Sequence, residues 1–217
     1  EAMLDKGTAE ISRQQVQDRL DALQTQLRIG FGFNEPGALQ VALQSRREHV
    51  AAAIELVAQL LRKPAFDAAV LDEVKRQVAT DIEASRKEPE AILQEAISRH
   101  GNPYPRGDIR HARSFDERLA DVQAATPQAL RDLHARIVGA SRVELALVGD
   151  FDADAVKAAA QRACGGCTTA VAYTRVPYPP RPAPPTRLVF KTPDKQNASM
   201  LVVQPVALKE GDADYAA

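Results

Sequence analysis

Hydrophobic positions in the first quarter of the chain recur with a period of two. Apolar side chains alternate with arginine and glycine over Leu27–Phe33, and a second alternation covers Leu39–Leu43. Such alternation is typical of a strand with one buried face. The sequence Asn-Glu-Pro-Gly at 34–37 separates the two stretches and has the composition of a turn. We therefore predict an antiparallel hairpin over these residues.

Elsewhere, apolar residues recur at intervals of three and four, which predicts amphipathic helices. The first helix follows Ser12, whose spacing to Gln15 matches a capping box. Prolines stand at the start or just after the end of several later helices, where they are best tolerated. These later helices are predicted at about 48–62, 67–87, 89–97, 115–122, from 127 onward, and 152–163.

A third alternating stretch, Val143–Val148, runs into Gly149–Asp150. We expect this strand to join the hairpin in one largely antiparallel sheet, because each strand has only one face to bury. The helices should pack on one face of that sheet, which gives an α+β fold. Gly149–Asp150 also occurs in phosphate and metal loops, but a strand-to-helix turn explains so common a pair.

The density of proline rises sharply between Arg175 and Pro185, as is typical of an extended, polyproline-like linker. Recognition by a proline-binding module is the alternative. A spacer is favoured because strand-like sequence resumes at once, at Leu188–Phe190 and Met200–Val206, and a helix is expected to begin near Asp212.

The chain is therefore expected to have three consecutive parts. These are an α+β domain over 1–173, a linker over 174–186, and the first strands of a second, similar domain over 187–217.

The composition narrows the classes of partner. Hydrophobic residues make up 45% of the 217 positions, enough for a packed core. The 28 basic and 29 acidic side chains leave a net charge of −1. A nearly neutral chain lacks the broad positive field that attracts nucleic acid or anionic membranes, so neither is expected as a partner. No apolar run reaches the length of a membrane span.

Histidines and cysteines are candidates for chemistry. His100 and His111 flank a loop at 101–107, without Cys, Asp or Glu at metal-ligand spacing. We interpret them as surface residues, and His49 and His134 as ordinary helix residues.

Cys164-Gly165-Gly166-Cys167 fits a redox pair, half of a zinc site, or a plain helix end. A redox pair should stand at a helix N-terminus, where the dipole lowers the thiol pKa, whereas this pair ends a helix. No second pair completes a zinc site. We therefore favour the helix end, with a local disulfide as an option if the protein is exported.

The opening residues carry the most specific signal. Glu1-Ala2-Met3-Leu4-Asp5-Lys6-Gly7-Thr8 is expected to be the last turn of a helix, with Gly7 just past its end. The plain interpretation is a frayed terminus. The segment also resembles Glu-His-Met-Leu-x-Lys-Gly-Thr, which closes the inverted zinc motif His-x-x-Glu-His of the insulinase/pitrilysin zinc metallopeptidases.

Further pieces of the chain resemble that family in the same order. They are Pro64-x-Phe66, Val148-Gly149-Asp150 and Thr192–Ala198. The resemblance implies a fold like that of mitochondrial processing peptidase, present here as a fragment that lacks its first strands.

The resemblance also implies which residues stand at the family's site. Glu1 matches the general base, whereas Ala2 replaces a histidine ligand, and the first histidine would lie upstream. The glutamate ligand position falls near Ile82, with Asp81 or Glu83 as neighbouring options. A zinc ion is therefore not expected to bind here.

By this resemblance, the segment belongs to the non-catalytic half of a zinc metalloendopeptidase. It should help to enclose an extended peptide while the catalytic half, in the same polypeptide or a partner subunit, holds zinc and hydrolyses it. Two alternatives stay open: a structural subunit like the family-related core proteins of respiratory complexes, or an active peptidase with ligands outside the segment. The compartment is open, and a periplasmic or otherwise exported location fits a bacterial member.

Overall fold

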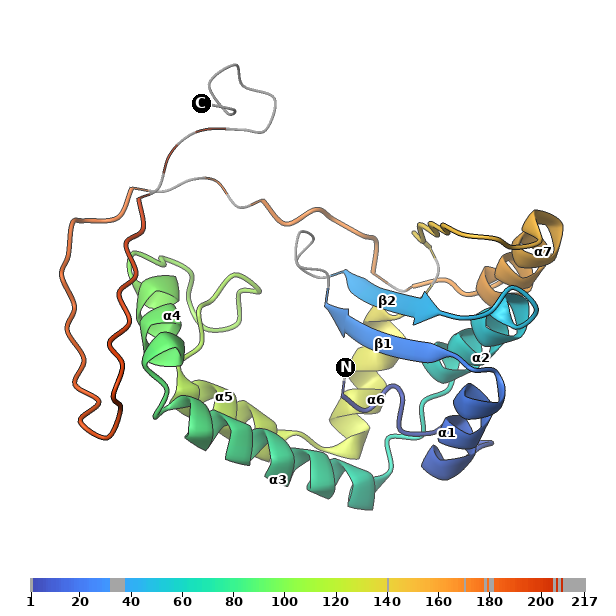
Figure 1. Ribbon diagram of the computed structural model, residues 1–217, viewed down its shortest axis with the longest axis horizontal. Helices are drawn as coiled ribbons and strands as arrows, with labels where there is room; N and C mark the ends of the chain where they lie inside the picture. Colours follow the sequence, from blue (N-terminus) through green and yellow to red (C-terminus); the bar gives the residue numbers. More distant parts are fainter. Residues whose placement is uncertain are drawn as a thin grey trace. The chain divides into compact units, whose positions relative to one another are not determined.

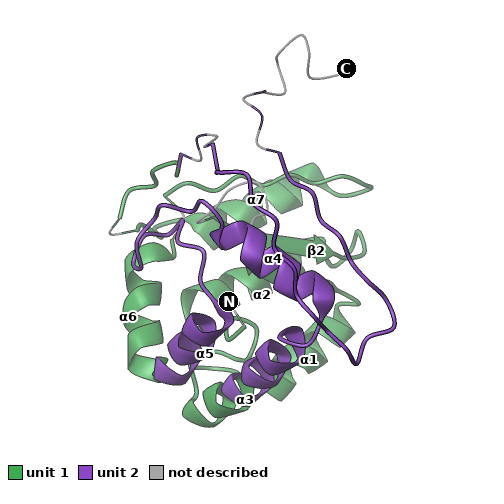
Figure 2. Ribbon diagram, turned by 90° about the vertical axis from the view of Figure 1, so that its left-hand side faces the viewer, with its two compact units in different colours: residues 1–74, 125–176 green, residues 75–124, 177–217 purple. Residues whose placement is uncertain are grey.

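The structure is a computed structural model that describes residues 2–31, 38–139, 141–169, 171–177, 179, 182–204, 206 and 208. The chain divides into two compact units, each made of two separate stretches (Figure 2). Unit 1 contains Glu1–Val74 and Ala125–Val176, and unit 2 contains Lys75–Ala124 and Pro177–Ala217. These units cut the chain differently from the three consecutive parts expected above, which stay a prediction.

Unit 1 contains two strands and most of the helices (Figure 1). Its elements are α1 (Arg13–Ala22), β1 (Gln26–Phe31), β2 (Leu39–Gln44), α2 (Val50–Arg62), the first part of α3 (Ala68–Ser85), α6 (Pro127–Ile137) and α7 (Ala153–Cys164). The predicted capping box begins α1: the Gln15 backbone N–H donates to Ser12 Oγ at 3.3 Å, and the Ser12 N–H donates to Gln15 Oε1 at 2.8 Å. This arrangement satisfies two backbone donors that the first helical turn leaves unpaired.

The predicted hairpin is confirmed over its described residues. β1 and β2 are antiparallel, with Leu27 opposite Leu43 and Phe31 opposite Leu39. Phe33 and the turn at 34–37 lie outside the described residues.

Two hydrophobic clusters form the core of unit 1. One contains Met3, Leu4, Phe66 and Leu71, and the other contains Ile11, Val16, Leu56 and Leu60. Strand residues cover both clusters, with Ile29 and Leu39 on the first and Leu27 on the second. α2 also packs against α7, whose facing residue Ala159 has no exposed surface. The sheet therefore buries one face, as its alternation predicts.

Unit 2 contains the rest of α3, α4 (Pro89–Arg99), α5 (Phe115–Ala124) and the described residues from Pro177 onward. Its buried hydrophobic side chains, among the described residues, are Ile82 and Phe115. The guanidinium groups of Arg86 and Arg118 lie 5.8 and 5.9 Å from the centre of the Phe115 ring. Such cation–π contacts cover an aromatic ring where few apolar neighbours are available.

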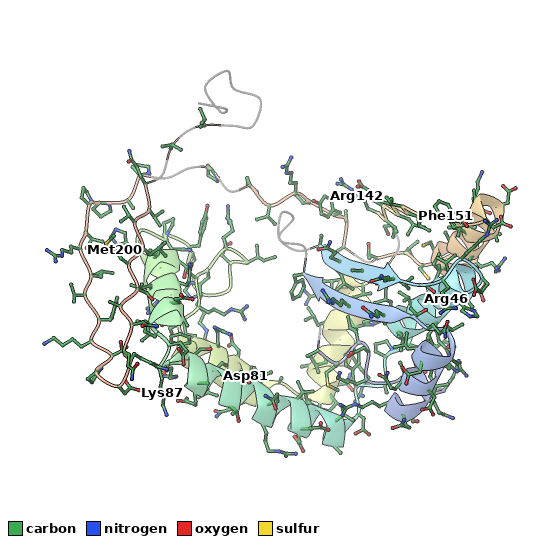
Figure 3. All side chains as sticks on the ribbon, in the orientation of Figure 1. Arg46, Asp81, Lys87, Arg142, Phe151 and Met200 are labelled. Atoms are coloured by element: carbon green, nitrogen blue, oxygen red, sulfur yellow. The ribbon has the colours of Figure 1, made fainter. Side chains whose placement is uncertain are left out.

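The α+β class is confirmed, but three predicted strands are not formed. Val143–Val148, Leu188–Phe190 and the described part of 200–206 are extended without ladder partners, and the sheet in the described residues has two strands. Their side chains are exposed, for example Val143 at 53% and Met200 at 88% (Figure 3). Alternation makes a segment competent to be a strand, but a strand forms only where a neighbour pairs with its backbone. The helix expected near Asp212 lies outside the described residues.

Candidate functional site

The opening segment is a turn rather than the last turn of a helix. Residues 2–5 have no helical hydrogen-bond pattern, and the Lys6 N–H donates to the Met3 carbonyl at 3.4 Å. Met3 and Leu4 are 5% and 6% exposed, whereas Ala2 is exposed. The two apolar side chains therefore anchor the segment in the first cluster, and Ala2 faces away from it.

Gly7 and Thr8 join this segment to the residues that follow α2. Gly7 has a φ of +112°, and a Cβ atom there would meet the Ile11 carbonyl oxygen at 3.0 Å. The Ala65 N–H donates to the Gly7 carbonyl at 3.1 Å, and Thr8 forms an isolated bridge with Pro64. This conformation and this close approach are possible only for glycine.

Thr8 is buried, and its hydroxyl oxygen is fully used. It accepts the backbone N–H groups of Glu10 and Ile11, each at 3.1 Å. A buried hydroxyl with such partners holds a turn in place. In the opening segment, four residues that match the family motif therefore have a structural role that involves no metal: Met3, Leu4, Gly7 and Thr8.

The second resembling piece packs against the first. Phe66, of the Pro64-x-Phe66 pair, is 6% exposed and has a φ of +46°, which is uncommon for an aromatic residue. The His134 ring lies edge-on to it at 5.6 Å, and His134 Nε2 lies 2.7 Å from the Leu61 carbonyl oxygen. His134 therefore links α6 to the end of α2, which agrees with its interpretation as an ordinary helix residue.

Near the position that the resemblance matches to the glutamate ligand, the chain has a buried hydrocarbon side chain. Ile82 is 1% exposed on α3 in unit 2, whereas Ala2 belongs to unit 1. On either side of Ile82, Asp81 (labelled in Figure 3) accepts a hydrogen bond from Gln77 at 2.9 Å, and Glu83 pairs with Arg86 at 3.3 Å. Among the described residues, no three His, Cys, Asp or Glu side chains gather as a metal site. Glu1 lies outside those residues, so its match to the general-base position of the family motif stays a prediction.

Asp150 and Asp152, which follow the predicted strand, have structural partners. Asp150 pairs with Arg47 and raises the pKa of that guanidinium. Asp152 Oδ1 accepts the N–H groups of Asp154 and Ala155, each at 3.0 Å, and so caps α7. Arg47 and Asp152 also line an open cavity of about 300 Å³ at the starts of α2 and α7.

Cys164 and Cys167 are free, half-buried thiols at the end of α7. The Cys167 N–H donates to the Cys164 carbonyl at 3.4 Å, across a turn in which Gly166 has a φ of +74°. The pair therefore ends the helix, as predicted.

The loop between α4 and α5 in unit 2 contains a group of charged side chains that the sequence interpretation missed. His111 Nδ1 lies 2.9 Å from the Tyr104 carbonyl oxygen, and His111 Nε2 lies 3.2 Å from both carboxylate oxygens of Glu117. Glu117 in turn accepts the Ser114 N–H at 2.9 Å, which completes a capping box at α5. The spacing Ser114-x-x-Glu117 is the signal that could have revealed it.

These contacts shift the acid–base equilibria of the loop. The Tyr104 carbonyl, followed by Glu117, raises the pKa of His111, since both stabilise the charged imidazolium. The Ser114 N–H, followed by His111, lowers the pKa of Glu117. Hydrogen bonds from Arg110 lower the pKa of Asp108 to about 2. Asp108 pairs with Arg110, and His111 pairs with Glu117, so charge contacts organise the loop.

Residues 124–217 match the family model of the peptidase M16 inactive domain. The chain is also similar to the crystal structure of a peptidase M16 inactive domain from Pseudomonas fluorescens, with a TM-score of 0.66 and 24% sequence identity. The match covers 82% of this chain and 42% of that one, so this chain spans less than half of its length. A comparison with curated proteins gave no match.

The comparisons agree with the predicted family: residues 124–217 match the M16 inactive-domain model in sequence, and the chain shares the fold of a solved M16 inactive domain. The described residues contain no helix that is long and apolar enough to cross a membrane.

Proposed function

We propose that this chain is a segment of the non-catalytic half of a zinc metallopeptidase, where it helps to enclose and bind the peptide that another half hydrolyses. One observation carries the proposal. The opening motif keeps its packing residues, with Met3 and Leu4 buried, while position 2 has only an exposed methyl group. This is the pattern expected when a peptidase fold is retained without its metal chemistry.

The small number of possible zinc ligands supports the proposal that this segment is not catalytic. A catalytic zinc takes about three protein ligands and a water molecule. Ala2 and Ile82 have no ligand atom, and Asp81 or Glu83 adds at most one carboxylate. Without the metal, a glutamate at position 1 has no water of lowered pKa to activate.

The two-stranded sheet is the best candidate for contact with an extended peptide. β1 and β2 pair with each other, and within the described residues their outer edges have no partner strand. A peptide can add to such an edge through main-chain hydrogen bonds, which need no metal. Phe31, 64% exposed at the end of β1, offers apolar surface beside that edge.

Metal content and peptide cleavage test the proposal together. The dialysed chain should contain no stoichiometric zinc by mass spectrometry and should not cleave a quenched peptide library, with or without added zinc. Ala2→His should not rescue cleavage, because one imidazole leaves the ligand set incomplete. One equivalent of tightly held zinc, or chelator-sensitive cleavage, would contradict the non-catalytic assignment.

A binding measurement separates this role from that of a purely structural subunit. A labelled, unstructured peptide should bind the chain equally well with and without zinc, because main-chain hydrogen bonds need no metal. The same peptide with N-methylated backbone amides is the control and should bind more weakly, because it lacks main-chain donors. Absence of any peptide binding to the folded chain would favour the structural subunit.

A further inference from the structure

The proline-rich segment is held against unit 2 by the end of α4 and the loop that follows it. His100 Nε2 lies 2.8 Å from the carbonyl oxygen of Pro184, and Arg110 Nη1 donates to the carbonyl of Pro177 at 3.4 Å. Gly101 has a φ of +67°, and a Cβ atom there would lie 2.8 Å from the Ala183 Cβ. Three neighbouring groups of one surface therefore contact the described residues of this segment.

Contacts with Asp108 and Tyr104 hold the Arg110 side chain in position for its hydrogen bond to Pro177. Its Nε and Nη2 atoms donate to Asp108 at 2.9 and 2.8 Å, which leaves Nη1 for the Pro177 carbonyl. Its guanidinium group also lies 3.9 Å from the centre of the Tyr104 ring. A guanidinium held on two sides loses little conformational entropy when it forms a further hydrogen bond.

These contacts suit a proline-rich backbone in particular. Proline has no backbone N–H, so such a segment offers mainly carbonyl oxygens, and the surface supplies N–H donors to them. An extended proline-rich chain is also partly ordered before it binds, which lowers the entropic cost of docking. The close approach of Ala183 to Gly101 is possible because Gly101 has no side chain.

An ion pair also holds the chain to α4 at a residue that follows the proline-rich segment. Lys195 Nζ lies 2.7 Å from Glu88 Oε1, at the start of α4, whereas His100 stands at its end. The segment from 184 to 195 therefore runs alongside α4 from its last residue to its first (Figures 1 and 2). The contact with Glu88 raises the pKa of Lys195, so this end stays charged.

We propose that His100, Gly101 and Arg110 form a binding surface for an extended, proline-rich peptide backbone. The chain's own Pro177, Ala183 and Pro184 lie on this surface, and we call the segment to which they belong the strap. The ligand class is therefore a peptide whose carbonyl oxygens point to the surface and whose small side chain lies over Gly101. The strap is independent of zinc and of substrate binding by the sheet.

Tryptic cleavage after Arg187 reports release of the strap. His100→Ala and Gly101→Ala should each speed cleavage at that bond by about two- to ten-fold, which is the range expected when one hydrogen bond is lost from a segment that must open before it is cut. His49→Ala is the matched control, because His49 makes no capping hydrogen bond at the start of α2 in unit 1. Mass spectrometry of the peptides follows each bond separately.

A synthetic peptide with the sequence of residues 175–186 tests the surface without any mutation. In excess, it should compete with the strap and speed cleavage after Arg187 in the unaltered chain, whereas a scrambled peptide should not. The labelled peptide should also bind a chain carrying Pro182→Gly, Ala183→Ser and Pro184→Gly, and His100→Ala in that chain should abolish the binding. Equal cleavage rates in all variants, or no effect of the peptide, would overturn the proposal, whatever the zinc and substrate assays show.

Discussion

Unit 1 and unit 2 bury very different amounts of hydrophobic surface. Nearly all buried apolar side chains of the described residues belong to unit 1, in the clusters around Leu60 and Met3, whereas unit 2 buries Ile82 and Phe115. Both units have exposed ion pairs, but in unit 2 several of them gather at the loop between α4 and α5, among them Arg106–Asp121 and His111–Glu117. The comparison indicates that the hydrophobic effect stabilises unit 1 and that charge contacts organise the loop of unit 2.

The largest expected effect tests the apolar side of this comparison. Leu60→Ala should destabilise unit 1 by about 2–5 kcal/mol, because it leaves a cavity in a fully buried cluster. Urea denaturation followed by circular dichroism gives the change. Leu133→Ala, at a site that is 46% exposed on α6, should change stability by no more than about 0.5 kcal/mol. Equal losses of stability at Leu60 and Leu133 would show that burial does not decide which side chains stabilise unit 1.

A smaller effect is expected where backbone conformation, rather than burial, is at stake. Gly7→Ala should cost about 1–3 kcal/mol, because the new side chain would hold a left-handed conformation and contact the Ile11 carbonyl. Gly30→Ala, where no atom lies within 4 Å of the added Cβ and φ is ordinary, is the control. If both variants unfold at the same urea concentration, the opening turn is not a fixed part of unit 1.

The loop of unit 2 should respond to pH. The pKa of folded His111 lies above its ordinary 6.5, so the stabilisation it gives is complete below pH 6.5 and is lost as pH rises through the raised value. Glu117, with a pKa lowered from 4.5, acts in the opposite direction and contributes fully above pH 4.5. Both contributions are therefore complete between pH 4.5 and pH 6.5. In this range the Ser114 amide should show its largest protection factor in hydrogen exchange.

Two substitutions sharpen that test. Glu117→Gln should lower the titration midpoint of His111 in proton NMR, because it removes the negative charge beside the imidazolium. Arg106 acts against Glu117 and lowers the pKa of His111, so Arg106→Gln should raise the midpoint. An unchanged midpoint in both variants would show that His111 is not part of this charged group in solution.

The smallest expected effect is that of salt. In about 1 M salt, the Debye length falls to about 3 Å, and exposed pairs such as Arg106–Asp121 and Lys195–Glu88 should weaken. Amides at the start of α5 should then exchange about twofold faster, in keeping with the small contribution of surface ion pairs. Amides in the middle of α2 are the internal control. Equal acceleration in both helices would indicate that charge contacts do not distinguish the units.

Local patterns predicted the helices well because apolar residues recur at helical spacing in them, and several helices also have their own start signal. Ser12 and Thr126 cap α1 and α6 as their sequences indicate, and prolines stand in the first turn of α4 and α6. The hairpin also followed from alternation on two neighbouring stretches. These features depend on residues that are close in the sequence.

Features that depend on distant partners could not be predicted in the same way. Val143–Val148 alternates as clearly as β1 does, yet among the described residues it pairs with no strand. His111 and Tyr104 are separated by a loop whose path no spacing rule gives, so their contact was missed. The contacts of His100 and Arg110 with Pro184 and Pro177 join residues far apart in the chain, and proline content alone predicted only an extended segment.

The opening turn has a consequence for how such sequences drift over evolutionary time. Ala2 is exposed and contacts no cluster, so once metal chemistry is no longer selected at that position, nearly any side chain is tolerated there. Met3, Leu4, Gly7 and Thr8 are instead constrained by the fold, because Met3, Leu4 and Thr8 are buried and Gly7 has a left-handed backbone conformation. The packing residues of such a motif can therefore stay recognisable after its metal ligands are lost. A sequence comparison that rewards Met-Leu-x-x-Gly-Thr detects ancestry, whereas the residue before it decides whether chemistry can be inferred.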